Sequence, residues 1–180
     1  MKLKAINNWV FVRRDAQETT HFGLEISDEA QVKNMLGEIV SIGNEDIAKP
    51  GQRIHIPHYQ VDDYEIQGEE MAVMKDDLLF AIEEDADFIP INRYVKVRKC
   101  INDHIRDYDG NLVLYQTEKF IESTHFVEII AIADDCKTLT SDHIGDVCIA
   151  PENDDRLQRL LYSKDYMIHE DLIKFTTDGD

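Results

Sequence analysis

The chain has 180 residues, a formal net charge of −18 and a hydrophobic fraction of 43%. The negative charge argues against nucleic acid or an anionic membrane surface as the main partner, because either would repel the chain before contact. The apolar residues are numerous enough for packed cores, yet no apolar run approaches the roughly 18 residues that a membrane span requires.

The first half of the chain is predicted to be mostly β. Five segments have the apolar, β-branched or alternating content of short strands bounded by turn residues: residues 9–13, 38–42, 53–56, 71–74 and 78–82. We therefore expect an all-β domain.

One long segment of this half, residues 15–36, has no core pattern. Loops longer than about 12 to 15 residues in compact domains are usually functional or disordered. This loop carries a small apolar island, Gly23, Leu24, Glu25 and Ile26, in polar surroundings. Exposed apolar side chains on a loop usually mark a binding site for a partner, although the island could also fold back on its own domain.

The second half repeats the first. Residues 6–14, INNWVFVRR, return as residues 91–99, INRYVKVRK, at an offset of 91 − 6 = 85. A period this long indicates two copies of one small domain. We predict domains at residues 1–84 and 85–180, joined by a short charged linker. Domains of this size bury only about 60% of their chain surface, so partner subunits are expected as well.

Two insertions lengthen the second copy. One of them gives a second long loop, residues 100–126, with its own apolar island of Gly110, Leu112, Val113 and Leu114. Added length in such polar, turn-rich segments has little thermodynamic cost.

Taken in order, these segments resemble the GroES co-chaperonin family (chaperonin-10), once in each half of the chain. Residues 6–14 resemble the family's opening strand. Residues 23–26 resemble its mobile-loop glycine and apolar tripeptide, and residues 50–59 resemble its signature of glycine, strand, proline and tyrosine. The second half matches in the same order at residues 90–99, 110–114, 128–133, 144–151 and 166–175.

The resemblance implies two tandem GroES-like small irregular β-barrels, each with a long mobile loop. It also implies a function: a homo-oligomeric, ring-forming lid that caps an ATP-bound GroEL-type chaperonin and so assists folding of an enclosed, unfolded protein. The implied chaperonin contacts are Gly23, Leu24, Glu25 and Ile26 in the first loop and Gly110, Leu112, Val113 and Leu114 in the second.

The chain departs from the family's pattern at two places in its first copy. Glu25 stands where an apolar residue is expected, which predicts weaker or differently adapted binding through that loop. The stretch between Gly43 and Pro50 is short, which leaves little room for the family's roof hairpin.

Nothing in the sequence indicates an enzyme. The patterns of P-loops, dinucleotide-binding turns, hydrolase nucleophile elbows and zinc proteases are absent, so we expect no catalytic residue, cofactor or metal. His55 and His58 form an isolated pair that fits a strand and a turn residue better than a metal site. Three cysteines without a CxxC pair favour reduced thiols, a cytoplasmic location and no disulfide framework.

A structural or adaptor protein that reuses the barrel, for example as a ring or decoration protein of a virus particle, is the alternative reading. Strand-like sequence begins by Leu3, so we expect no signal or transit peptide. A tandem lid of this kind would suit a phage genome, in which case it would act in the host cytoplasm.

Overall fold

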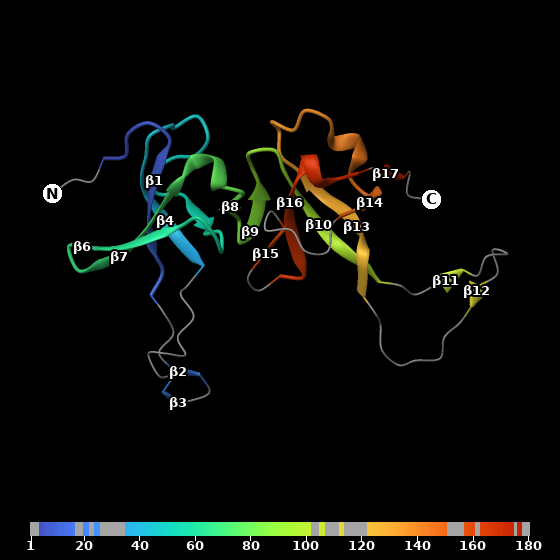
Figure 1. Cartoon of the computed structure of the whole chain (residues 1–180), viewed down its shortest axis with the longest axis horizontal. Coiled ribbons are helices and arrows are strands. Elements are labelled where there is room, and N and C mark those ends of the chain that lie inside the picture. Colours follow the sequence, from blue (N-terminus) through green and yellow to red (C-terminus); the bar gives the residue numbers. More distant parts are fainter. Residues whose placement is uncertain are drawn as a thin grey trace. The chain divides into compact units, whose positions relative to one another are not determined.

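The computed structural model describes residues 4–16, 20–21, 24–25, 35–101, 105–106, 112–113, 122–150, 157–160, 163–174 and 176–177. The chain divides into two compact units, Met1–Asn92 and Arg93–Asp180. Each unit is built on one antiparallel sheet, and the predicted all-β fold class is confirmed (Figure 1).

Unit 1 is a seven-stranded sheet in the order β6-β7-β1-β4-β5-β8-β9. Its strands are β1 (Trp9–Arg14), β4 (Leu36–Ile42), β5 (Arg53–His55), β6 (Asp62–Ile66), β7 (Glu69–Lys75), β8 (Ala81–Glu84) and β9 (Asp87–Pro90). A short 3-10 turn, η2 (Asp76–Leu78), separates β7 from β8. The first residue of the predicted strand at residues 78–82 therefore belongs to this turn, and β8 begins three residues later than expected.

The core of unit 1 lies inside the curl of this sheet. Val10 and Val12 alternate inward along β1 and pack with apolar residues from β4, β5, β7 and β8 in one buried cluster. One glycine permits the tight approach of the chain that closes this core. A Cβ atom at Gly43 would lie 1.8 Å from the carbonyl oxygen of Asn7, so no other residue fits there without displacing the backbone.

Unit 2 is a six-stranded sheet in the order β15-β16-β10-β13-β14-β17. Its strands are β10 (Tyr94–Ile101), β13 (Glu122–Ile132), β14 (Val147–Ile149), β15 (Leu157–Arg159), β16 (Asp165–His169) and β17 (Thr176–Thr177). Two 3-10 turns, η3 (Ser141–His143) and η4 (Glu170–Leu172), precede β14 and β17. Its core packs Val95, Val97 and Ile129 around Cys148 and Ile168.

The two sheets share their strand pairing down to the register. Phe11 lies opposite Val73, and Lys96, 85 residues after Phe11, lies opposite Met167, 94 residues after Val73. The first strand of each unit has its register shift at the same point, after Phe11 and after Lys96.

The turns that precede β5 and β14 are also the same. Gly51 and Gly145 have positive φ angles of 89° and 97°. Each donates its amide hydrogen to an isoleucine carbonyl of the neighbouring strand, that of Ile39 and that of Ile129. Only a residue that tolerates the left-handed region fits such a turn, which explains a glycine in both units.

The sheets differ by one strand, β9. It pairs with β8 through a two-residue turn at Asp85 and Ala86, both with positive φ. The division between the units consequently falls after Asn92 rather than after residue 84, because residues 85–90 complete the sheet of unit 1. What the sequence suggests as a charged linker is a tight hairpin.

Candidate functional site

The first loop segment contains a short hairpin. Strands β2 (Thr20–His21) and β3 (Leu24–Glu25) form a separate two-stranded sheet, in which His21 lies opposite Leu24 and Thr20 opposite Glu25. Of the predicted contact residues, Leu24 and Glu25 thus lie on one strand, and Gly23 and Ile26 lie outside the described residues.

The base of this loop is fixed to the sheet. The Asp15 amide donates to the Leu36 carbonyl at 2.9 Å, and the Arg53 guanidinium forms ion pairs with the carboxylates of Asp15 and Glu83. At Gly37 a Cβ atom would lie 2.5 Å from the Arg13 carbonyl oxygen, so the strands that frame the loop pack backbone to backbone. The loop therefore starts at the end of β1 and returns at the beginning of β4, where the two strands are paired.

The second loop segment has the same plan. Strands β11 (Ile105–Arg106) and β12 (Leu112–Val113) form another separate two-stranded sheet, with Val113 opposite Ile105 and Leu112 opposite Arg106. Leu112 and Val113 thus occupy the second strand of their hairpin, as Leu24 and Glu25 do in theirs. Gly110 and Leu114 lie outside the described residues.

The frame of the second loop is longer than the sequence predicts. Strand β10 runs to Ile101, which pairs with Glu122 at the start of β13. The predicted loop of residues 100–126 is shortened at both ends, because the two strands continue their ladder beyond the core. The second apolar island is carried on a longer β stem than the first.

The titratable side chains of the sheets have structural roles. His55 is fully buried between the rings of Phe80 and Phe88, and its Nδ1 lies 3.2 Å from the Ile56 carbonyl oxygen. Burial lowers the pKa of His55 to about 4, with the Ile56 carbonyl opposing and the charge of His58 adding to this effect.

Glu170, the first residue of η4, connects this turn to the segment that follows β13. Its buried carboxylate accepts hydrogen bonds from the amides of Lys137 and Thr138 and pairs with Arg93. Burial on its own would raise the pKa of Glu170, but these donors outweigh it and lower that pKa to about 2. Because it accepts two backbone amides of that segment, this carboxylate holds the connection between β13 and η3 in place.

The described residues hold no group of three or more histidine, cysteine or acidic side chains placed to bind a metal ion. Burial raises the pKa of Cys136 and of Cys148 to about 12, which makes both thiols poor nucleophiles. In the same part of the chain, no helix has the length and apolar character needed to cross a membrane.

The fold and its candidate site define a class: small all-β units that carry a separate hairpin between the first two strands of their core. Residues 2–83 match the family described as Chaperonin 10 Kd subunit. The chain is 30% identical to the co-chaperonin GroES of Nitrosococcus oceani over 95 residues, which cover 99% of that protein and 47% of this chain. It is 33% identical to the co-chaperonin GroES of Ruthia magnifica, in an alignment that covers 100% of that protein and 47% of this chain. It is 35% identical to the co-chaperonin GroES of Acidiphilium cryptum, in an alignment that covers 91% of that protein and 47% of this chain.

The chain belongs to the chaperonin 10 kDa subunit family. One whole relative aligns with about half of it, so the chain contains a complete family domain and as much sequence again.

Proposed function

We propose that this protein is a co-chaperonin, a lid that caps a GroEL-type chaperonin in an ATP-dependent manner and assists folding of the enclosed protein. Its membership of a family whose relatives are named co-chaperonin GroES carries the proposal. In this role the protein is not an enzyme and needs no cofactor. It acts in the cytoplasm, which is that of the host if a phage encodes it.

Unit 2 is proposed to be a second copy of the family domain. The support is the common strand order, the shared register of the first strand and the equivalent glycine turns at Gly51 and Gly145. Each chain would then fill two adjacent positions of a ring.

Strand β9 supports the assembly of that ring. At the repeat offset of 85, its residues 87–90 correspond to residues 2–5, which precede β1. In this chain the strand before the second copy completes the sheet of the first, next to β8. Residues 2–5 of another chain could add to β17 of unit 2 in the same way, because β17 is the counterpart of β8 in the strand order.

The two loop hairpins are proposed as the chaperonin-binding segments. Gly23, Leu24, Glu25 and Ile26 would contact one apical domain of the chaperonin ring, and Gly110, Leu112, Val113 and Leu114 the next. Each hairpin is a short two-stranded sheet whose second strand includes an apolar residue, Leu24 in the first and Leu112 and Val113 in the second, and such a β element suits insertion into a groove. Two loops on one chain raise each other's effective concentration, so that weak individual contacts suffice.

Electron microscopy of the protein mixed with its cognate chaperonin and ATP tests this function directly. We expect capped chaperonin particles with ATP and none without nucleotide. The double variant Leu24→Ser, Leu114→Ser should lose the caps and keep its fold, whereas Ile144→Ser, which removes an exposed apolar side chain outside the loops, should cap normally.

Failure to form caps with ATP, under conditions where an ordinary lid of the family binds, would contradict the proposal. A ring that assembles without ever capping would favour the structural or adaptor role in a virus particle. Normal capping by the double variant would remove the two hairpins from the mechanism.

A further inference from the structure

Strand β5 holds both ends of the first loop segment. Where the loop returns to β4, the Ile56 amide directly after β5 donates to the Met35 carbonyl at 2.6 Å. Where the loop leaves β1, the Arg53 guanidinium forms an ion pair with the Asp15 carboxylate. Strand β4 lies between β1 and β5 in the sheet, so the Arg53 side chain spans it to reach Asp15. One backbone hydrogen bond and one cationic side chain thus fix the two ends.

The same guanidinium is also held by β8. Its Nε lies 2.9 Å from Oε2 of Glu83, which is its cross-strand neighbour because Ile54 lies opposite Ile82 in the β5–β8 ladder. This Oε2 is buried and accepts no hydrogen bond within the described part of the chain, so the Arg53 cation is the group that compensates its charge. An isolated exposed ion pair contributes little, whereas a guanidinium held by two carboxylates forms a network. We call Asp15, Arg53 and Glu83 the Arg53 bridge.

Unit 2 does not repeat the Arg53 bridge. At the repeat offsets of 85 for Asp15 and 94 for the other two residues, it has Cys100, Val147 and Thr177, and Val147 lies opposite Thr177. None of these side chains can form an ion pair. Strands β10, β13, β14 and β17 nevertheless pair in the same order as β1, β4, β5 and β8. The sheet therefore forms without the bridge, and the bridge serves the first loop alone.

We propose that Arg53 is a positioning residue of the first loop, because it fixes the point where the chain leaves β1 and ties that point to β8. Strand β2 begins at Thr20, five residues after Asp15, so a fixed base restricts where the β2–β3 hairpin lies. A segment restricted in this way loses less entropy when it binds a partner. The bridge thereby offsets part of the cost of Glu25 in the apolar island. This consequence rests on the proposed function, whereas the positioning of Asp15 does not.

Hydrogen exchange of the free protein measures the positioning. Mass spectrometry of fragments that cover residue 15 gives the protection factor of its amide, which donates to the Leu36 carbonyl. Arg53→Gln should lower this factor by about threefold or more at low salt, and the difference should shrink at about 1 M salt. The matched control is Arg13→Gln, which breaks the ion pair with Glu69. Its arginine is 46% exposed, against 47% for Arg53, and its loss should leave the factor unchanged.

A second substitution distinguishes positioning from a general effect on stability. In the wild type, Asp15→Asn removes one partner of Arg53 and should lower the protection of residue 15. In the Arg53→Gln background the same substitution should raise it, because it removes one of two carboxylates, Asp15 and Glu83, that the guanidinium no longer holds together. An arginine that merely stabilised the sheet would give losses of the same sign in both backgrounds.

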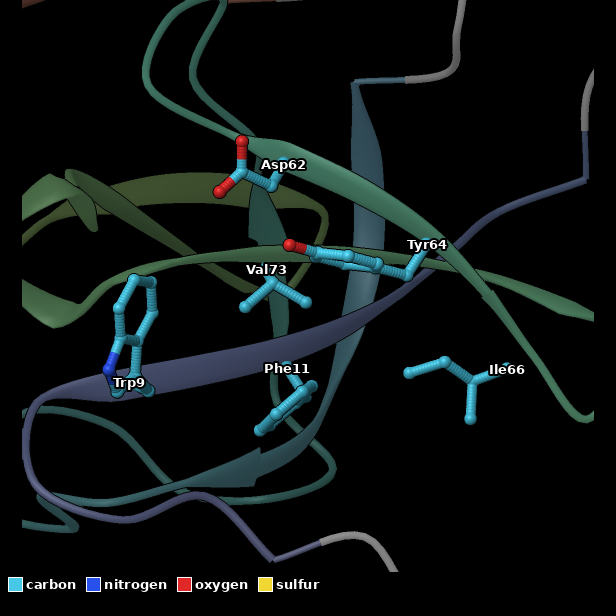
Figure 2. Close-up of a pocket in the computed structure, with 6 residues that line it drawn as sticks. All are labelled: Trp9, Phe11, Asp62, Tyr64, Ile66 and Val73. Carbon is cyan, nitrogen blue, oxygen red and sulfur yellow. The ribbon is translucent and has the colours of Figure 1, made fainter.

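Trp9 reports whether the variants keep the sheet of unit 1. It lies in an apolar groove of about 360 Å³ over β1, β6 and β7, and Figure 2 shows Trp9 and Phe11 along β1, with the Tyr64 ring reaching from β6 toward Val73. In the strand order the groove and the Arg53 bridge lie on opposite sides of β4, so the emission of Trp9 should stay unchanged. If Arg53→Gln alters that emission, the pair Arg53→Val, Glu83→Thr replaces it, since unit 2 has these residues in the same ladder.

Unchanged protection in a folded Arg53 variant would overturn the proposal, as would an equal loss in Arg13→Gln or losses of the same sign in the two backgrounds. Dissociation from immobilised chaperonin with ATP then measures the consequence for binding, and Arg53→Gln should dissociate about threefold faster or more. An unchanged dissociation rate after lost protection would overturn the role of Arg53 in binding. A wild type that never binds the chaperonin would contradict the proposed function instead, while the exchange experiment would still decide the positioning.

Discussion

At the scale of single residues, the immediate surroundings set the charge state of two buried titratable groups, His55 and Glu170. His55 is enclosed by two phenylalanine rings and titrates near pH 4, while Glu170 is enclosed by hydrogen-bond donors and titrates near pH 2. The two groups lie in different units and lose their native charge state in different pH ranges. Acid should therefore weaken unit 1 before it weakens unit 2.

The pH dependence of unit 1 provides a test of the buried histidine. The folded state keeps His55 neutral down to a pKa of about 4, whereas the unfolded chain takes up a proton near pH 6.5. Stability is therefore complete above pH 6.5 and falls between pH 6.5 and 4, by up to about 3 kcal/mol. Urea unfolding followed by Trp9 fluorescence should show this slope in the wild type and lose it in His55→Gln.

His58→Gln is the matched control, because His58 is exposed and neighbours the same site. This variant should retain most of the slope. The interpretation would be wrong if His55→Gln kept the wild-type pH dependence, whatever its stability at neutral pH.

At the scale of elements, the β8–β9 hairpin is the feature that sets the boundary between the two units. Its turn places Asp85 and Ala86 at φ angles of 49° and 66°, the conformation of a two-residue hairpin in which Asn and Gly are the favoured residues. Ala86 occupies the left-handed region without the usual glycine, so the turn is strained.

Replacing Ala86 with glycine should relieve that strain. We expect Ala86→Gly to stabilise unit 1 by about 0.5 to 1 kcal/mol, because glycine adopts positive φ without a Cβ clash and this gain exceeds its greater loss of entropy. Hydrogen exchange in residues 81–90 should slow accordingly. The same substitution at Ala131, which lies in β13 opposite Lys96, should destabilise its unit by a similar amount. Equal signs for the two variants would show that the turn is not strained.

The strands with apolar alternation were predictable, and those without it were not. Residues 9–13 bury Val10 and Val12 at period two, and residues 38–42 bury Ile39 and Ile42 across a register shift. Both segments form the centre of the sheet. Strand β6, DDYEI, has four exposed residues and one half-buried residue, so it lacks the period that identifies a strand. The signal that could have found it is its turn, Gln67 and Gly68, where both φ angles are positive.

The candidate site was predictable only in part. The position of the loop islands followed from the absence of a core pattern, but their pairing into β2–β3 and β11–β12 did not, because two-residue strands carry no periodicity. The groove also escaped prediction. Trp9 and Phe11 appear in sequence as ordinary members of a buried strand, and only the register shows that they face away from Val10 and Val12.

At the scale of the whole molecule, the chain combines two sheets of common strand order with two unlike loops. The two sheets have the same strand pairing, register and glycine turns, because the core of each unit requires them. The loops differ at the centre of their apolar islands, where the first has Glu25 and the second has Val113. If both loops bind a chaperonin, this difference sets how strongly the lid is held and how readily it leaves.

A reciprocal exchange of these two residues tests that idea. A carboxylate in an apolar groove loses hydration without compensation, so Glu25→Val should tighten capping and Val113→Glu should weaken it. Because every chain in a ring carries both loops, a few tenths of a kcal/mol per loop accumulate to a change of about tenfold or more in residence time. Surface-immobilised chaperonin with ATP measures the dissociation rate of each variant. If both substitutions left that rate unchanged, the central residue of the island would have no part in the contact; opposite shifts would show that the centre of each island lies in the contact.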